Sequence, residues 1–380
     1  MPEKSIKPIC FYLPQFHTIP ENDEAYGEGF TEWTNVKKAK PLFKNHNQPR
    51  VPLNYNYYCL LDYQVMKKQA ELAKSYGIYG FCYYHYWFKN GKKLLEKPVE
   101  MMLKNKQIDI PYCLCWANEN WTRRWDGGDN GIIIEQNYGD FNDLKHHIDY
   151  LCEYFSDSRY ICIDNKPLFL IYKPELIPGL KKVIKFIRNR VKENGFDGIK
   201  IAVQYPKFIL DEGKISCFDY LIEFEPQYIH SYFQYEKRNP AQKFIKKTLL
   251  NVGFDKCVKH IEKKRILLKT FNNLEKLDYC DYDEYWLKIL NHRIQNKKMI
   301  AGAFVDWDNT PRNVNGRVFT NVSPEKFEKY LKQYKSKISK EYDSEFLFIN
   351  AWNEWAEGAY LEPDEKNGYA YLEALKRALN

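Results

Sequence analysis

The chain has 380 residues, which is too long for one small domain and suits either a single large α/β barrel or two modest domains. Aromatic residues make up 17% of it, an excess compatible both with a large core and with a surface that grips ring-shaped ligands. The formal net charge of +8 is modest for this size and most basic residues are scattered, so nucleic acid is not expected as a partner.

Eight short apolar segments with strand character recur along the chain. They are KPICFYL (7–13), IYGFCYYHYW (78–87), PYCLCWA (111–117), PLFLIY (167–172), IKIAVQ (199–204), FDYLIEF (218–224), MIAGAFVDW (299–307) and FLFINAW (346–352). Eight parallel strands close a (β/α)8 barrel, so a TIM barrel is the predicted fold. An open doubly wound sheet is the alternative, but its usual glycine-rich phosphate loop, GxGxxG or GxxxxGK(S/T), does not occur in the sequence.

Helical periodicity separates several of these strands. Apolar residues at i, i+3 and i+4 predict helices over 62–77, 140–155, 180–195 and 323–336. Ser323 is a suitable N-cap for the last helix, and Gly77 and Gly195 are suitable helix stops. Strands that alternate with helices in this way favour a parallel sheet with crossover helices.

The segment 227–298 interrupts this rhythm, because it is too long for one crossover and is rich in lysine. The chain is therefore predicted to be one catalytic domain over 1–380, with a helical, lysine-rich subdomain inserted over 227–298 between the sixth and seventh strands. Lysines border an apolar face within 236–271. This pattern fits peripheral contact with an anionic inner membrane leaflet, but because Gly253 interrupts it, a helical subdomain packed on the barrel with its lysines in water is favoured.

The sequence offers no export or anchoring signal and no metal motif. The N-terminal MPEKSIKPICFYLP has no apolar run suited to a signal peptide, and no uncharged apolar stretch is long enough to span a bilayer, so a cytoplasmic protein is expected. Several of the ten cysteines, among them Cys10, Cys82, Cys113, Cys115 and Cys162, fall in apolar strand-like runs. Buried free thiols are favoured over disulfides or a zinc site, and no metal ion or cofactor is expected.

Polar and aromatic clusters follow the predicted strands: PQFH, NENWTRRWDGGDN, EPQY, DNTPR and NEWAEG. In a barrel these strand ends open onto one face, which holds the active site. Indole faces stack on sugar rings, and amides or carboxylates bind sugar hydroxyls. The side chains expected to contact a ligand are Tyr12, Gln15, Tyr84, His85, Trp87, Trp116, Asn118, Glu119, Trp121, Glu225, Asp306, Trp307, Trp352 and Asn353.

Structural roles compete with these assignments. Trp116 could instead belong to the core, with Glu119 paired to Arg123 or Arg124, and a lone histidine such as His85 is more often a hydrogen-bonded structural residue. Glu225 ends an apolar strand, where a carboxylate needs either a partner or a function. In DNTPR, the residues after Asp306 and Trp307 are typical of a turn.

The stretch INAWNEWAEG (349–358) holds two carboxylates, Glu354 and Glu357, three residues apart. A straight strand would point them to opposite faces, so the chain is predicted to turn near Trp355 and to bring both beside one bond. Glycoside chemistry uses such a pair, with one carboxylic acid protonating the leaving oxygen while the other acts as base or nucleophile. Alternatively, one glutamate pairs with arginine and the other caps a helix near Asn367.

Six motifs, FYLPQFH, GFTEWTNV, GFCYYHYWF, WANENWTRRWDG, FVDWDNTPR and NAWNEWAEGAYLEPD, together resemble the WbsX-type glycosyltransferase family. That family is similar to glycoside hydrolase family 99, the endo-α-mannosidases. The resemblance implies a (β/α)8 barrel, a retaining mechanism and no metal. In the hydrolases the first Glu of NEWxE assists the sugar 2-hydroxyl as an internal nucleophile and the second protonates the leaving oxygen. Glu354 would then be the base and Glu357 the general acid.

Three functions follow from these patterns. The first is glycosyl transfer in bacterial cell-surface polysaccharide synthesis, on an oligosaccharide or lipid-linked sugar. The second is endo-hydrolysis of the α-mannosidase type, although Ala356 stands where those hydrolases usually carry a larger polar residue, so the substrate is not fixed as a mannoside. The third is a glycan-binding barrel without catalysis, which would have no need of an acid and a base held together.

Overall fold

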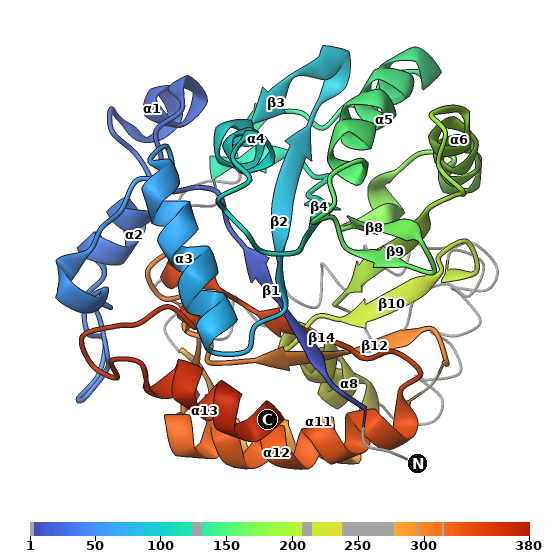
Figure 1. Ribbon diagram of the computed structural model, residues 1–380. Helices are drawn as coiled ribbons and strands as arrows, with labels where there is room; N and C mark the ends of the chain where they lie inside the picture. The colour runs from blue at the N-terminus through green and yellow to red at the C-terminus, as the bar shows by residue number, and fades with distance from the viewer. Residues whose placement is uncertain (1–3, 124–130, 207–214, 238–276, 295, 314) are drawn as a thin grey trace.

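The computed structural model describes residues 4–123, 131–206, 215–237, 277–294, 296–313 and 315–380 (Figure 1). Its centre is a barrel of eight parallel strands, in which β1 pairs with both β2 and β14 and so closes the sheet. Around the barrel the strands are β1 (Lys7–Tyr12), β2 (Gly80–Trp87), β4 (Tyr112–Trp116), β8 (Lys166–Ile171), β9 (Lys200–Tyr205), β10 (Tyr220–Glu223), β12 (Met299–Phe304) and β14 (Phe346–Asn350). All eight predicted strands and the predicted (β/α)8 fold are confirmed.

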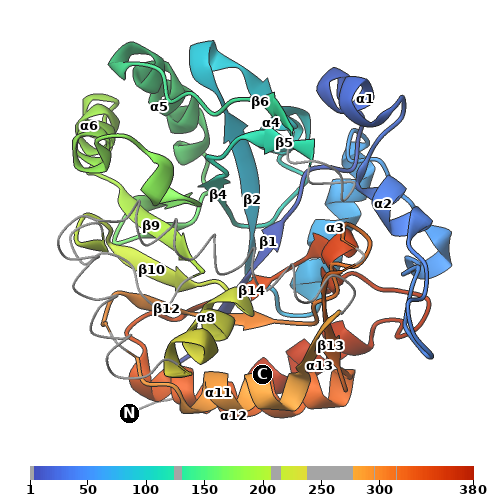
Figure 2. The same ribbon diagram turned by 180° about the vertical axis from the view of Figure 1, so that it is seen from behind.

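Helices surround the barrel on its outside, as Figures 1 and 2 show. The described α-helices are α1 (Pro20–Tyr26), α2 (Glu32–Lys38), α3 (Tyr63–Ser75), α4 (Glu96–Lys104), α5 (Phe141–Phe155), α6 (Leu180–Glu193), α8 (Gln227–Glu236), α11 (Tyr282–Asn291), α12 (Pro324–Glu341) and α13 (Ala370–Leu379). The four predicted helices correspond to α3, α5, α6 and α12. Because strands and helices alternate, each helix can cover the gap between neighbouring strands with its apolar stripe.

The ends of these helices follow their local sequence. The Ser323 hydroxyl accepts a hydrogen bond from Lys326 N at 3.3 Å and caps α12 as predicted. Gly77 and Gly195, just after α3 and α6, adopt φ values of +85° and +91°, which glycine reaches without a Cβ clash. Helix α12 runs to Glu341, beyond the predicted 336, because its buried face continues through Ile338.

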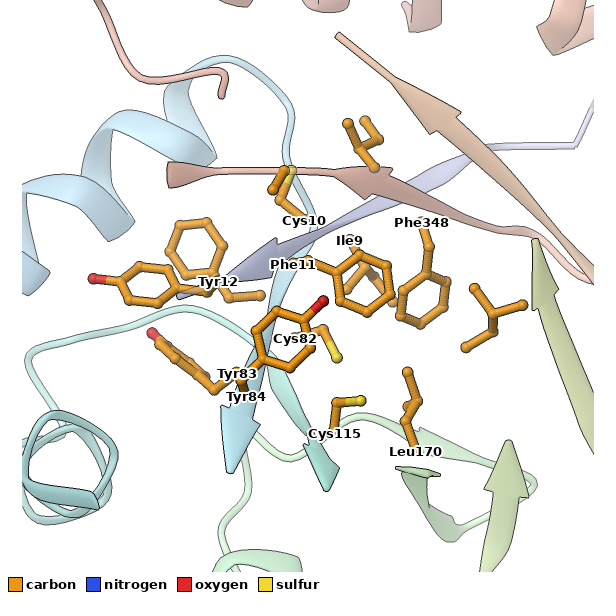
Figure 3. Packing of buried hydrophobic residues seen from close by; sticks show 14 of the residues in the cluster. Ile9, Cys10, Phe11, Tyr12, Cys82, Tyr83, Tyr84, Cys115, Leu170 and Phe348 are labelled. Carbon is orange, nitrogen blue, oxygen red and sulfur yellow. The ribbon is translucent and has the colours of Figure 1, made fainter. Parts of the chain in front are cut away.

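Aromatic and sulfur-containing side chains fill the barrel. Phe11 on β1 stacks on Tyr84 of β2, with ring centroids 5.8 Å apart, and meets Phe348 of β14 at 5.6 Å. Figure 3 shows these rings beside Cys82 and Cys115 inside the barrel. Tyr12 and Tyr83 point away from this group, to the other face of their strands. The interior is therefore a packed core, and any ligand must bind at the strand ends.

The connection from β10 to β12 contains the predicted insertion. Its described parts are α8, the short strand β11 (Asp278–Asp281) and α11. On α11, Trp286 stacks on Phe304 of β12 at 5.7 Å and on Tyr330 of α12 at 5.9 Å, so this helix packs on the barrel wall. Most of the lysine-rich stretch lies within 238–276, outside the described residues, and the extent of the insertion and its membrane contact stay predictions.

Two further sequence expectations concern membranes and cysteines. None of the helices within the described ranges is both long enough and apolar enough to cross a membrane. Cys10, Cys82, Cys113 and Cys115 are buried free thiols as predicted. Cys162 is also a free thiol, but the prediction that it is buried was wrong, because it lies exposed on the two-residue strand β7 (Cys162–Ile163) at the edge of β8.

Candidate active site

A tight turn follows β14 and carries both glutamates. The chain passes through the short strand β15 (Asn353–Glu354), a 3-10 turn (Trp355–Glu357) and the strand β16 (Ala359–Tyr360), which pairs with β15. Gly358 closes the turn at φ +63°, where an added Cβ would lie 2.9 Å from both Asp308 N and Arg50 Nη2. The turn predicted near Trp355 is present.

The turn brings the two glutamates to a single guanidinium. Arg312 donates from Nη1 to Glu357 Oε1 at 2.6 Å and from Nη2 to Glu354 Oε2 at 3.3 Å. Its Nη2 also donates to Glu32 Oε1 at 2.7 Å. We call these four residues the Arg312 cluster. Both glutamates therefore pair with an arginine, where the sequence alternative expected one. Neither caps a helix near Asn367, because Asn367 N donates to Asp364 instead.

The Arg312 cluster contains three carboxylates and one guanidinium, so it is under-neutralised. Burial and the adjacent Glu357 charge raise the pKa of Glu354 well above its usual value, although Arg312 acts in the opposite direction. Burial also raises the pKa of Glu357, again against the effect of Arg312. Two close carboxylates that both resist ionisation titrate as a pair. Arg312 lies nearer to Glu357 than to Glu354, so the guanidinium stabilises the ionised form of Glu357 more strongly.

Glu32 connects the cluster to the barrel's first loop. It is the first residue of α2, and its backbone N donates to Gln15 O at 3.0 Å. Its Oε1 accepts a hydrogen bond from Ala356 N at 3.0 Å, in the middle of the turn that carries Glu354 and Glu357. The next residue, Trp33, packs on Trp355 with centroids 5.3 Å apart. Helix α2 therefore holds the turn through both a charge and an aromatic contact.

A second arginine–carboxylate network lies behind the turn. We call it the Arg50 cluster, and its members are Arg50, Asp306, Asp308, His46, Gln48 and Thr310. Arg50 Nη2 donates to Asp306 Oδ2 at 2.8 Å, and Asp308 Oδ2 accepts from His46 at 2.9 Å and from Gln48 at 2.7 Å. Asp308 N donates to Glu357 O at 2.7 Å, so this network supports the backbone of the turn.

A buried carboxylate also lies beneath Trp355. Glu362 accepts hydrogen bonds from Trp355 Nε1 at 2.7 Å, Tyr58 OH at 2.8 Å and Gln69 Nε2 at 2.7 Å. Burial raises the pKa of Glu362 to about 7, even though these three donors favour its ionised form. The indole between the two glutamates is thereby held in one orientation.

The Arg312 cluster opens into a cavity of about 570 Å³, within the usual range for ligand sites. Its lining consists of Leu13, Tyr84, Tyr86, Ala117, Glu119, Asn120, Trp121, Thr122, Tyr172, Lys173, Pro206, Phe224, Gln227, Trp307, Asn309, Arg312, Asn313, Glu354 and Glu357. Most of these residues lie at or beyond the carboxyl ends of the strands. Aromatic walls with carboxylates and amides between them suit a sugar, which has apolar ring faces and polar edges.

Of the sequence-predicted residues, six line this cavity: Tyr84, Glu119, Trp121, Trp307, Glu354 and Glu357. Glu119 forms an ion pair with Lys173 across the cavity wall, and not with Arg123. The Glu357 side chain is 22% exposed and that of Glu354 is 10% exposed, so Glu357 lies nearer to the opening.

Other predicted residues belong to the scaffold. Tyr12 is buried and its hydroxyl donates to Gln69 Oε1 at 2.6 Å. Gln15 is fully buried beside the start of α2. Asn353 bonds to both the N and the O of Leu13, at 2.7 and 3.0 Å, and so joins the turn to the end of β1. Trp352 is fully buried, and its N donates to Phe11 O at 2.8 Å.

His85, Trp87 and Trp116 form a buried aromatic group around His147 of α5. The His85 and His147 Nε2 atoms are 2.9 Å apart, and Trp87 stacks on the His147 ring at 4.7 Å. The edge of the Trp116 ring faces the same imidazole at 4.7 Å. Burial lowers the pKa of His85 to about 3, so it is neutral at ordinary pH. These three residues therefore pack in the core, as the structural alternative for Trp116 and His85 predicted.

Asn118, Glu225 and Asp306 also lie outside the cavity lining. Asn118 exchanges hydrogen bonds with the N and O of Lys173, at 2.8 and 2.7 Å, and so positions the residue that pairs with Glu119. Glu225 Oε2 accepts from Ile229 N at 3.0 Å at the start of α8. Asp306 is engaged by Arg50, and the residues after it form the predicted turn, with Thr310 bonded to Asp308.

Sequence reasoning missed the two charges that hold the carboxylate pair. Glu32 belongs to the GFTEWTNV motif and Arg312 to DNTPR, but nothing local marks either as a partner of Glu354. It also missed Tyr86, although strand alternation on β2 predicts that Tyr84 and Tyr86 share a face while His85 and Trp87 share the other. Among the described residues there is no group of three or more His, Cys, Asp or Glu arranged to hold a metal ion.

Comparisons with known proteins agree with this architecture. The chain matches the family model described as Glycosyltransferase WbsX over residues 8–375. Two proteins from two strains of Xanthomonas campestris pv. campestris, both named uncharacterized protein WxcX, are 35% identical to it over 374 residues. The match covers 98% of this chain and 49% of each relative, so the chain spans about half the length of the curated relatives it matches.

Solved structures share the fold. A GH99 endo-alpha-mannosidase from Bacteroides thetaiotaomicron superposes with a TM-score of 0.52 at 12% identity, and its complex with bis-tris-propane with 0.54 at 13%. Each match covers 98% of this chain and 96% of the other. A structure described as a glycoside hydrolase-like protein gives 0.57 at 14% identity, covering 99% and 94%. At these identities the likeness shows a common fold, and the resemblance predicted from the six motifs is confirmed.

Proposed function

The chain belongs to the WbsX glycosyltransferase family, and from that premise we propose that it transfers a glycosyl unit, with retention of configuration, in bacterial cell-surface polysaccharide synthesis. The observation that carries the proposal is the pair Glu354 and Glu357 on one guanidinium at the wall of an aromatic cavity. Retaining chemistry uses two carboxyl groups that flank the scissile bond and lie close together, and the shared guanidinium keeps this pair close.

In the proposed reaction Glu357 is the general acid and Glu354 the base. The greater exposure of Glu357 supports the acid role, because the leaving group must depart through the opening. Glu354 lies deeper, where it accepts the proton of the sugar 2-hydroxyl as that oxygen attacks the anomeric carbon. The acceptor hydroxyl then attacks the anomeric carbon and opens the three-membered ring; Glu357 takes the acceptor's proton, and Glu354 returns its proton to the sugar 2-oxygen.

Arg312 lies nearer to Glu357 and favours its ionised form, whereas a general acid must be protonated, so in this proposal the substrate moves a proton to Glu357. A sugar hydroxyl that donates a hydrogen bond to Glu354 stabilises its ionised form. The proton shared by the pair then favours Glu357, which is the state that a general acid requires. The proposal therefore links substrate binding to the readiness of the acid.

The charges of the cavity bear on the sugar donor. In the described lining the two cations, Lys173 and Arg312, are both paired with carboxylates. A nucleotide diphosphate needs cations or a backbone cradle, so this lining favours an uncharged oligosaccharide, or a lipid-linked sugar whose phosphates lie outside the cavity. Endo-hydrolysis remains the second candidate, since it differs only in using water as the acceptor.

The test is a product analysis by mass spectrometry, with candidate oligosaccharides and lipid-linked glycans, in the presence and absence of an acceptor. Transfer predicts an elongated acceptor, and hydrolysis predicts free reducing ends whether or not acceptor is present. Early NMR spectra of the products must show retained anomeric configuration, and an inverted first product would rule out the mechanism. A catalytically silent glycan-binding barrel would yield no product, and its Glu354→Gln and Glu357→Gln variants would keep both binding and cellular role.

A further inference from the structure

The Arg312 cluster has a charge arrangement that the acid and base roles alone do not explain. Arg312 contacts both members of the carboxylate pair, and its Nη2 also donates a hydrogen bond to Glu32. Glu32 is fully buried, at 0% exposure, and burying a carboxylate is costly unless it is paired. A third carboxylate in this position reduces the neutralisation that Arg312 provides to the other two.

We infer that Glu32 and Arg312 act as a charge clamp, a pair of positioning residues that keeps one proton on the Glu354–Glu357 pair and holds both carboxylates on the catalytic turn. Arg312 favours ionisation of the pair, whereas Glu32 opposes it from the far side of the guanidinium. Glu32 also fixes the turn through Ala356 N. The clamp thus combines geometry with control of protonation.

The other titratable groups near Glu354 and Glu357 are either neutral or paired with each other. Tyr84 and Tyr86 on β2 and Tyr172 after β8 have pKa values raised by burial, so their hydroxyls are neutral near pH 7. Glu119 and Lys173, which also line the cavity, form an ion pair with each other. Among the described residues, Glu32 and Arg312 are therefore the charges that set the proton count of the pair.

Two charge-removing variants must shift the titration of the pair in opposite directions. Arg312→Gln removes the favourable cation, so both apparent pKa values of the pair should rise by about one unit or more. Glu32→Gln keeps an oxygen that can accept from Ala356 N and Arg312 while removing the like charge, so both values should fall by about one unit. Arg312→Lys retains the cation and should shift them much less than Arg312→Gln.

The measurement is a pH titration by carbon NMR of protein labelled at the glutamate side-chain carboxyl. The Glu354 and Glu357 signals are assigned by their loss in Glu354→Gln and Glu357→Gln. Arg190→Gln and Glu345→Gln, which break ion pairs on the outside of the barrel, serve as controls and should leave both midpoints in place. If Arg312→Gln does not fold, Glu32→Gln and Arg312→Lys still decide the matter.

Shifts in the same direction for Arg312→Gln and Glu32→Gln would overturn the clamp. So would unchanged midpoints in folded Glu32→Gln, or a shift in Arg312→Lys as large as that in Arg312→Gln. The catalytic meaning of the clamp rests on the proposed function, but the titration needs no substrate. A clamp that titrates as expected beside a negative product analysis would therefore reject the proposed function alone. Once a substrate is in hand, both limbs of the pH–rate profile should move up in Arg312→Gln and down in Glu32→Gln.

Discussion

Two arginine–carboxylate clusters lie next to each other beyond β12 and β14, and they differ in how completely their charges are satisfied. In the Arg50 cluster, Asp308 accepts from His46, Gln48 and Thr310, and Arg50 is bound to Asp306. These donors hold the pKa of Asp308 below its usual range despite its burial. In the Arg312 cluster, one guanidinium serves three carboxylates, and burial raises the pKa values of Glu354 and Glu357.

The two clusters contain similar residue types, but they differ in how many hydrogen-bond donors surround each carboxylate. In the Arg50 cluster the donors around Asp308 favour its ionised form, whereas burial raises the pKa of Asp306 against the effect of Arg50. In the Arg312 cluster the carboxyl groups of Glu354 and Glu357 both resist ionisation, a property that acid–base chemistry uses. The Arg50 cluster supports the turn through the hydrogen bond from Asp308 N to Glu357 O, and the Arg312 cluster is the part that we propose to be reactive.

The largest expected effect is on rate, in the Arg312 cluster. Glu357→Gln should reduce turnover of a natural glycan by about 10²- to 10⁴-fold, the range for loss of a general acid, without lowering stability. An activated aryl glycoside should restore most of the rate, because its leaving group needs no protonation. Glu354→Gln should lose activity on both substrates. Steady-state kinetics on the two substrates checks this, and near-normal turnover of the natural glycan by Glu357→Gln would show that the acid lies elsewhere.

The next effect is on stability, in the Arg50 cluster. Arg50→Met leaves Asp306 buried without its cation, so it should lower the free energy of unfolding by about 3–5 kcal/mol. Arg312→Met leaves Glu32 buried without its cation but should still cost less, about 1–3 kcal/mol, because Glu354 and Glu357 face the cavity. Urea unfolding of both variants measures the contrast. Equal losses would mean that the two clusters do not differ as described.

Glu362 provides a pH-dependent test of the scaffold behind the turn. Its pKa is raised from 4.5 to about 7 in the folded protein, so it stabilises the fold below pH 4.5, and this contribution is lost as the pH rises towards 7. The wild type should therefore lose roughly 2–3 kcal/mol from this group between pH 5 and pH 8. Glu362→Gln does not titrate and should show a correspondingly smaller loss. Urea unfolding at both pH values gives the comparison, and an identical pH dependence in the variant would contradict it.

The smallest effect on stability is expected at the ion pair between Lys173 and Glu119 in the cavity lining. The Lys173 and Glu119 side chains are 24% and 34% exposed, and such pairs contribute under about 1 kcal/mol. Lys173→Met should therefore unfold at almost the same urea concentration as the wild type. Asn118→Ala is the informative partner variant, because it releases the backbone of Lys173 and should cost more. A Lys173→Met loss as large as that of Arg50→Met would place this pair among the structural clusters instead.

Local patterns predicted most of the fold. The eight strands were recognisable because buried parallel strands are continuous apolar runs, and Ser323 and Gly195 mark helix ends through chemistry that acts within one turn. The same reasoning found Glu354 and Glu357, because two carboxylates around Trp355 at a strand end are visible in ten residues. It also predicted that Tyr12 and His85 contact the ligand. Both lie near strand ends, but their side chains are buried and do not line the cavity.

The sequence by itself determined the barrel, the polar and aromatic clusters at its strand ends and the carboxylate pair, since each depends on neighbours a few residues apart. Only the tertiary structure decided which charges surround that pair. Arg312 meets Glu32 across 280 residues and Glu354 across 42, and Arg50 meets Asp306 across 256. Electrostatic energy depends on distance in space and on burial, and closure of the barrel sets both, so the division into a supporting and a reactive cluster arises only when the strands come together.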